Sequence, residues 1–115
     1  MKPIGTLCLV ALALAAGLAV TASGARAQDG KTLFLAQKCN LCHSVQTAGI
    51  ERVTRSEKVA GPELTDLAAK AEPAFLAQYL KKEATLHDKK HSKQFQGSEA
   101  ELKALITWLQ QQKKK

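Results

Sequence analysis

Two cysteines and a histidine lie within five residues near the start of the chain, in the run Cys39-Asn40-Leu41-Cys42-His43. Thiols three residues apart lie about one helical turn from each other, so they can bond to two points on one edge of a single group. This C-x-x-C-H spacing is the attachment signature of c-type haem, in which the thiols form thioethers and the histidine reaches the iron from the same side. We therefore expect the chain to fold around a large, covalently held ligand.

Three other kinds of site use the same residue types: a redox-active thiol pair, a structural zinc site and a plain disulfide. The redox pair is expected in a βαβ context, which the sequence lacks. A zinc ion would require the adjacent Cys42 and His43 to share one tetrahedron with Cys39 and a later histidine, which is a poor arrangement. Zinc would also leave long loops unfilled, so haem attachment is the prediction.

Residues 1–27 have the pattern of a secretory signal peptide. Lys2 is followed by an apolar run from Leu7 to Val20 and by Ala25-Arg26-Ala27, a small-x-small cleavage site. The apolar run is shorter than the roughly 20 residues needed to span a bilayer. We therefore expect a cleaved leader, a bacterial periplasmic location, and a mature domain of residues 28–115 with no stable membrane insertion.

The mature domain is close to the lower size limit for a self-sufficient core. Its 88 residues include only five aromatic side chains, and a chain of this length buries roughly 60–65% of its unfolded surface. A multidomain enzyme is excluded, and a bound cofactor would supply missing apolar contacts. Two of the 17 basic residues lie in the leader, so the mature domain has 15 against 10 acidic residues and a formal net charge of +5.

Hydrophobic spacing predicts up to four short helices. The first follows Asp29, whose side chain can cap it, and runs for about ten residues. The spacing of Leu64, Leu67 and Ala68 predicts a short helix that stops by Glu72-Pro73, and a longer one runs from Pro73 to about Ala84. The last begins at Ser98, where a capping box with Glu101 precedes an apolar face. No segment alternates as a strand would, so the predicted fold is all-α.

Two stretches lack steady periodicity and read as loops, namely Ser44–Ala60 and Thr85–Gly97. Gly61-Pro62 ends the first of them as a turn. Loops of 13 to 17 residues are unusual in so small a domain unless they enclose something. They favour a large ligand inside the fold.

Together these features resemble a small monohaem class I cytochrome c. The resemblance covers nearly all of residues 29–112 and rests on Gly30–Phe34, the C-x-x-C-H motif, Gly61-Pro62-Glu63-Leu64, and Phe95-x-Gly97-Ser98 before a leucine-rich last helix. It implies a cytochrome c-like fold of three to four short helices wrapped around one covalently bound haem c. It also implies electron transfer rather than enzymatic catalysis.

By the same resemblance, particular residues of this chain acquire roles. Cys39 and Cys42 would attach the haem, and His43 would bind its iron. The carbonyl of Pro62 would accept a hydrogen bond from Nδ1 of His43, which fixes the tautomer and plane of the ring.

The family also packs its first helix across its last. Phe34 on the first helix and Trp108 or Leu105 on the last suit such a crossing, and we expect Trp108 to belong to the core. Spacing alone suggests the apolar residues that would surround the haem: Leu64, Leu67, Phe75, Leu76, Tyr79, Leu80 and Phe95.

The chain departs from its family at the second iron ligand, which is usually a methionine shortly before a Phe-x-Gly stretch. The only methionine is Met1, in the leader. His91 lies four residues before Phe95, close to where the sulfur would be, and neutral imidazole is a good iron donor. We predict His91 as the sixth ligand and His87 as the alternative, with a lysine (Lys89, Lys90 or Lys93) or an open position remaining. A separate metal pair of His87 and His91 would require a helix there.

Two functions follow from these ligands. The first is a soluble periplasmic electron carrier, or the electron-transfer subunit of an oxidoreductase, with bis-histidine iron of lower potential than a His/Met relative. The alternative is a haem enzyme or a gas- or peroxide-binding protein with an open sixth position, where His91 would be a distal polar group.

Basic residues gather around the predicted distal loop. Such a cluster would attract redox partner proteins with acidic docking surfaces, although it could also be an ordinary solvated face. Nucleic-acid binding is not expected in an exported chain without an aromatic platform. The basic residues concerned are Lys81, Lys82, Lys89, Lys90 and Lys93, together with Lys113, Lys114 and Lys115 at the end of the chain.

Overall fold

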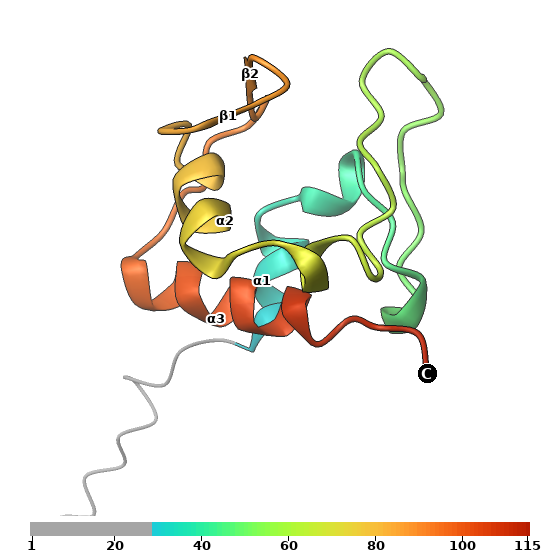
Figure 1. Cartoon of the computed structure of the whole chain (residues 1–115). Helices are drawn as coiled ribbons and strands as arrows, with labels where there is room; N and C mark the ends of the chain where they lie inside the picture. Colours follow the sequence, from blue (N-terminus) through green and yellow to red (C-terminus); the bar gives the residue numbers. More distant parts are fainter. Residues whose placement is uncertain (1–28) are drawn as a thin grey trace, which may run out of the picture.

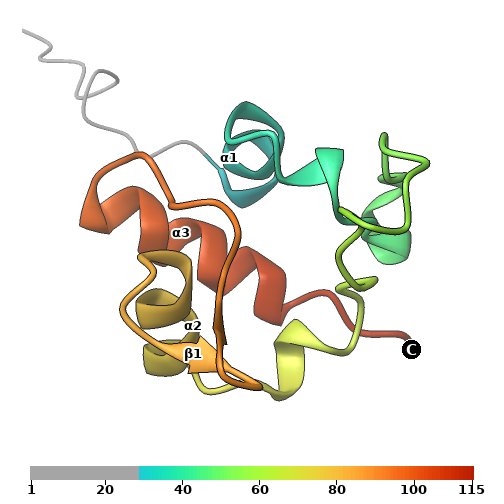
Figure 2. The same cartoon turned by 90° about the horizontal axis from the view of Figure 1, so that it is seen from above.

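The computed structural model describes residues 29–115, so the leader predicted for residues 1–27 lies outside the described residues. Figures 1 and 2 show short helices and one small hairpin joined by long loops. The elements in chain order are α1 (Gly30–Ala36), the 3-10 helices η2 (Cys39–Leu41), η3 (Gln46–Ala48) and η4 (Ala68–Lys70), α2 (Pro73–Leu80), the strands β1 (Thr85–Leu86) and β2 (Lys89–Lys90), and α3 (Glu99–Gln110). The described part is therefore mainly helical, as predicted.

Helix α1 begins where the sequence predicts it and ends earlier. The Asp29 carboxylate accepts a hydrogen bond from the Thr32 amide at 3.0 Å and caps the helix. Lys38 adopts a left-handed backbone conformation with φ of 60°, which an α-helix cannot continue. The predicted length of about ten residues is thus wrong, since α1 has seven.

Helix α3 is the scaffold on which the other helices pack. Ser98 and Glu101 form the predicted capping box, each side chain bonding the backbone amide of the other residue. In Figure 1, α3 runs along the base of the molecule, with α2 and the hairpin above one end and the green loop of residues 51–60 above the other. Its buried face consists of Leu102, Leu105, Ile106 and Leu109, as predicted.

The crossing of α1 and α3 is close because α1 begins with a glycine. A Cβ on Gly30 would lie 1.9 Å from the Cβ of Trp108, so a larger residue cannot stand there without moving the helices apart. The rings of Phe34 and Trp108 are 5.5 Å apart between centroids, which confirms the predicted contact. The buried core that forms around this crossing comprises Leu33, Phe34, Val45, Ile50, Ala68, Leu105 and Leu109.

The middle of the chain is less helical than predicted. The short helix expected between Leu64 and Glu72 is a turn followed by η4, because Asp66 has a φ of 68° that interrupts a helix. Helix α2 ends at Leu80 rather than near Ala84, and Lys82 again has a left-handed backbone (φ 62°). The interruption at Asp66 and the end of α2 before Lys82 both depend on left-handed backbone turns, which hydrophobic spacing does not predict.

A short hairpin interrupts the predicted loop over Thr85–Gly97. Thr85 pairs with Lys90 and Leu86 with Lys89, in antiparallel register. The turn residues His87 and Asp88 have φ values of 52° and 64°, the pattern of a two-residue turn that matches strand twist. Within residues 29–115 no helix is both long enough and apolar enough to cross a bilayer.

Candidate functional site

The C-x-x-C-H motif occupies a single turn at the end of α1. The left-handed Lys38 redirects the chain into η2, and the amides of Cys42 and His43 both donate to the carbonyl of Cys39, at 3.2 and 3.0 Å. Cys39 and Cys42 are free thiols and are half-buried. The two sulfurs and the imidazole thus leave the backbone within one turn, as haem attachment requires.

The Cys39 thiol does not have the character of a redox nucleophile. Burial raises its pKa to about 11, and the positive charge of Lys93 opposes that change only in part. Cysteines of redox pairs have lowered pKa values, because the thiolate is the attacking species. The structure therefore gives no support to the redox-pair alternative for Cys39 and Cys42.

The His43 ring is held on two sides by the turn at Gly61-Pro62. Its Nδ1 donates a hydrogen bond to the carbonyl oxygen of Pro62 at 2.8 Å, the contact that the resemblance implies. Gly61 passes against the ring, where a Cβ would lie 2.2 Å from Cε1 of His43, and its amide donates to the Cys42 carbonyl at 2.8 Å. Burial lowers the pKa of His43, with the bond to Pro62 opposing it, and favours the neutral imidazole that a metal needs.

Glu63 fastens the segment after His43 to the segment after Pro62. Its carboxylate accepts hydrogen bonds from the amides of Gln46 at 3.0 Å and Thr65 at 2.8 Å, and from the Ser44 hydroxyl. Burial would raise the pKa of Glu63, but these donors favour the ionised form and lower it to about 2. Glu63 therefore stabilises the turn that holds His43.

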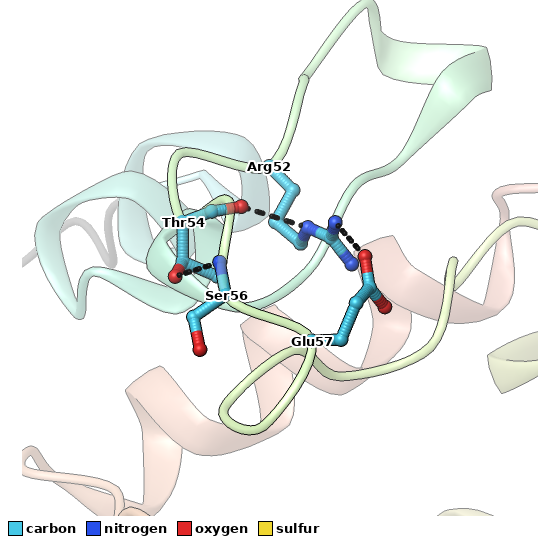
Figure 3. A network of polar contacts seen from close by, with 4 residues as sticks. All are labelled: Arg52, Thr54, Ser56 and Glu57. Carbon is cyan, nitrogen blue, oxygen red and sulfur yellow. Dashed lines mark hydrogen bonds and ion pairs between the residues drawn. The ribbon is translucent and has the colours of Figure 1, made fainter.

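The loop of residues 51–60 is hydrogen-bonded to the backbone of the C-x-x-C-H motif. The amides of Val53 and Thr54 donate to the carbonyls of Asn40 and Leu41, each at 2.9 Å. Figure 3 shows how the loop holds its own shape: Arg52 donates to the Thr54 carbonyl and to the Glu57 carboxylate, both at 3.0 Å. In the same view the Ser56 amide donates to the Thr54 hydroxyl at 3.2 Å. Carbonyls of the motif are thus satisfied by a loop without regular structure.

His91 lies next to His43, although the two are far apart in the sequence. Their ring centroids are 6.1 Å apart and their planes are inclined by 7°. The Nδ1 of His91 donates to the carbonyl oxygen of Lys93 at 2.5 Å. A carbonyl can only accept, so Nδ1 of each ring carries the proton and Nε2 is the nitrogen available to a metal.

This spacing fits two imidazoles on opposite sides of one metal ion. A bond from a metal to an imidazole nitrogen is about 2.0 Å, and the ring centre lies roughly one ångström further back. Two such ligands in line have centroids about 6 Å apart, close to the distance between His43 and His91. Both rings also have the carbonyl partner that metal-bound histidines commonly use. The ring spacing and the free Nε2 of each ring are therefore compatible with a haem iron that His43 and His91 would hold.

His87 occupies a different environment. It lies in the exposed turn of the hairpin, four residues before His91 and on no helix. The helix that a separate His87–His91 metal pair would require is therefore not formed, because these residues belong to a hairpin and the loop after it. The ring that approaches His43 is that of His91.

Aromatic residues of α2 border His91. The Tyr79 ring meets it edge-on, with centroids 5.2 Å apart and planes at 67°, and Phe75 stacks on Tyr79 at 5.6 Å. Leu64, Leu80 and Phe95 are partly buried against the core, whereas Leu67 is 51% exposed. Phe75 and Tyr79 thus lie beside His91, and Leu64, Leu80 and Phe95 lie against the core.

Sequence reasoning missed three residues that support the two histidines, namely Gln37, Glu63 and Lys93. Glu63 stands at the variable position of the Gly-Pro-x-Leu element, where its type carries no signal by itself. Gln37 and Lys93 contact each other across 56 residues of sequence. No local pattern predicts such a contact.

Comparison with known proteins identifies the family. The family profile described as Cytochrome c matches residues 27–113, which include the whole C-x-x-C-H motif and the three α-helices. Searches of curated proteins and of solved structures gave no match. The match covers most of the chain, and the helical fold agrees with it. The protein is therefore a member of the cytochrome c family, a small helical class I c-type cytochrome that binds covalent haem c.

Proposed function

We propose that this cytochrome is a one-haem electron carrier, or the electron-transfer subunit of an oxidoreductase, with His43 and His91 as the axial ligands of its iron. The observation that carries the proposal is the pair of parallel imidazoles 6.1 Å apart. The absence of methionine from residues 28–115 supports it, because the usual sulfur donor has no source there. The leader pattern of residues 1–27 supports an exported, periplasmic location.

Each residue of the site has one part in this function. Cys39 and Cys42 would hold the porphyrin through thioethers, and bound haem supplies a one-electron couple between ferrous and ferric iron. His43 and His91 are each fixed at Nδ1 by a backbone carbonyl, so their rings keep their orientation in both oxidation states. A site that changes little between the two states favours fast outer-sphere electron transfer.

Two imidazoles also set the direction of the reduction potential. Thioether sulfur favours ferrous iron and raises the potential, so replacing it with a second histidine should lower the potential relative to His/Met cytochromes. We therefore expect a carrier at the lower end of the family's range.

Alanine variants of the two candidate histidines test the ligand assignment. In the haem-loaded protein, His91→Ala should convert low-spin ferric iron to high-spin iron, while His87→Ala, the matched control, should leave the spectrum unchanged. The wild-type ferric protein should also lack the weak near-infrared band of sulfur ligation. A high-spin wild-type spectrum with rapid carbon monoxide binding would contradict the carrier and favour the open-site alternative.

The basic residues around the loop of His91 suggest how partners dock. They differ in whether an acidic side chain neutralises their charge. Lys81 is engaged with Glu83 and Glu99, at 3.6 and 3.2 Å, so part of its charge is neutralised. Lys89 and Lys90 are exposed on β2. We propose that these two help attract acidic redox partners, which predicts that electron-transfer rates fall as salt is added.

A further inference from the structure

The loop that carries His91 is joined to the end of α1 by a two-point contact. The side-chain amide of Gln37 accepts a hydrogen bond from the Gln96 amide at 3.0 Å and donates to the Gln96 carbonyl. Both backbone groups of Gln96 are thus paired with one side chain. This pairing resembles one rung of a β-ladder and fixes direction as well as distance.

Lys93 makes a second connection between the same two segments. Its ammonium donates to the Gln37 carbonyl at 2.5 Å, while its own carbonyl accepts the hydrogen bond from Nδ1 of His91. Gln37 is the C-cap of α1, where a cation is favoured by the carbonyls at the helix end. The residue that orients His91 is therefore itself anchored at the end of α1.

The anchor lies close to the haem-attachment motif. Gln37 stands two residues before Cys39, the first cysteine of the motif. Between Lys93 and Gln96 the loop is also tied to the end of α2, where the Phe95 amide donates to the Leu80 carbonyl at 2.9 Å. Contacts at α2 alone would place His91 relative to Tyr79 but not relative to the motif.

We propose that Gln37 and Lys93 are positioning residues that act through His91: together they hold the distal imidazole at a fixed distance and plane relative to the C-x-x-C-H turn. This inference rests on the proposed ligand role of His91. According to this inference, these two side chains determine how often His91 would leave the iron and open its sixth position.

The segment that follows His91 has little other structure to hold it in place. Ser92, Lys93 and Gln94 are exposed and belong to no helix or strand. Segments with few buried contacts open locally at small free-energy cost. If Gln37 and Lys93 were lost, the loop would release His91 more often, and the sixth position would become accessible to small ligands.

The rate of ligand exchange tests this directly. When cyanide is saturating, its substitution for a histidine ligand in the ferric protein is limited by histidine dissociation. Gln37→Ala removes two hydrogen bonds and Lys93→Ala removes one, so we expect exchange to become about 30-fold faster in the first variant and about 5-fold faster in the second. Lys93→Arg, which keeps a cationic donor, should restore most of the wild-type rate.

Matched controls separate positioning from general effects. Lys103→Ala removes a charge from the exposed face of α3, and Gln94→Ala removes an amide from the same loop, and both should exchange cyanide at the wild-type rate. Gln37→Glu keeps the acceptor for Gln96 but places a carboxylate oxygen against the Gln96 carbonyl oxygen, and since both can only accept, exchange clearly faster than in the wild type is expected. That variant keeps the proposal testable if the alanine variants retain too little haem.

The possible failures are distinguishable. If His91→Ala abolishes the low-spin spectrum but Gln37→Ala, Gln37→Glu and Lys93→Ala all exchange cyanide at the wild-type rate, the positioning role is wrong and the ligand assignment stands. If His91→Ala leaves the low-spin spectrum intact, the ligand assignment fails and this inference fails with it. If Lys103→Ala accelerates exchange as much as Lys93→Ala, the effect is one of charge, and the positioning role of Lys93 is wrong.

Discussion

The imidazole planes of His43 and His91 are inclined by only 7°. The π orbitals of two parallel axial imidazoles interact with the same iron d orbital, whereas crossed rings interact with one orbital each. Parallel rings therefore separate the d-orbital energies, and we expect a rhombic low-spin electron paramagnetic resonance spectrum with three resolved g values from the ferric, haem-loaded protein. A single, strongly shifted g value would instead indicate crossed rings and contradict this geometry.

Glu63 should make the stability of the haem-loaded protein depend on pH in the acid range. Its pKa is about 2 in the folded protein, below an ordinary value of 4.5, so the stabilisation is complete above about pH 4.5 and is lost as the pH falls towards 2. Because the group is partly solvated, we expect a contribution of about 1 kcal/mol. Denaturant unfolding at several pH values measures it.

The substitution Glu63→Gln should remove most of this pH-dependent contribution. It should lower the free energy of unfolding at pH 7 by about 1 kcal/mol, since fewer charge-assisted hydrogen bonds remain. Glu72→Gln, at an exposed residue before α2, is the control and should change little. Equal effects of the two substitutions would show that the contacts of Glu63 do not stabilise the turn.

Gly30→Ala should be strongly destabilising for a residue at the start of a helix. The added carbon would lie 1.9 Å from the Trp108 Cβ, and the strain of such overpacking typically costs about 1–3 kcal/mol. Lys31→Ala, at the next position and exposed, should be nearly neutral. A thermal midpoint of Gly30→Ala equal to that of Lys31→Ala would mean that the two helices separate without cost.

The hairpin turn offers a stabilising change. His87 and Asp88 both have positive φ, and glycine adopts this conformation without the steric cost that other residues incur. We expect Asp88→Gly to raise the free energy of unfolding by about 0.5–1 kcal/mol and to leave the haem spectrum unchanged. A fall in stability would show that the Asp88 side chain contributes more than its backbone costs.

The sequence predicted best what is encoded over a few residues. The capping box of Ser98 and Glu101 and the apolar face of α3 depend on neighbours three and four positions apart, and both are present. The C-x-x-C-H turn is equally local. The contact of Phe34 with Trp108 needed the family resemblance as well, because local spacing does not say which helices meet.

What the sequence did not predict depends on distant contacts and on backbone turns. Gln37 and Gln96 are 59 positions apart, and a glutamine at a helix end has many roles in other proteins. The hairpin lacks the Asn-Gly pair that usually signals its turn type, so it read as a loop. The early ends of α1 and α2 follow from left-handed lysines, which no propensity scale favours.

Helix α3 contacts α1, which leads into the C-x-x-C-H motif, and also α2, whose Tyr79 borders His91. The close approach of Gly30 to Trp108 therefore affects the separation of α1 and α2. Helix α1 leads to His43, and α2 borders His91. Substitutions that change side-chain volume at this crossing should therefore alter the distance between the two imidazoles, and with it the strength of their bonds to iron. The chain could in this way adjust its iron chemistry by substitutions that never touch the iron's neighbours.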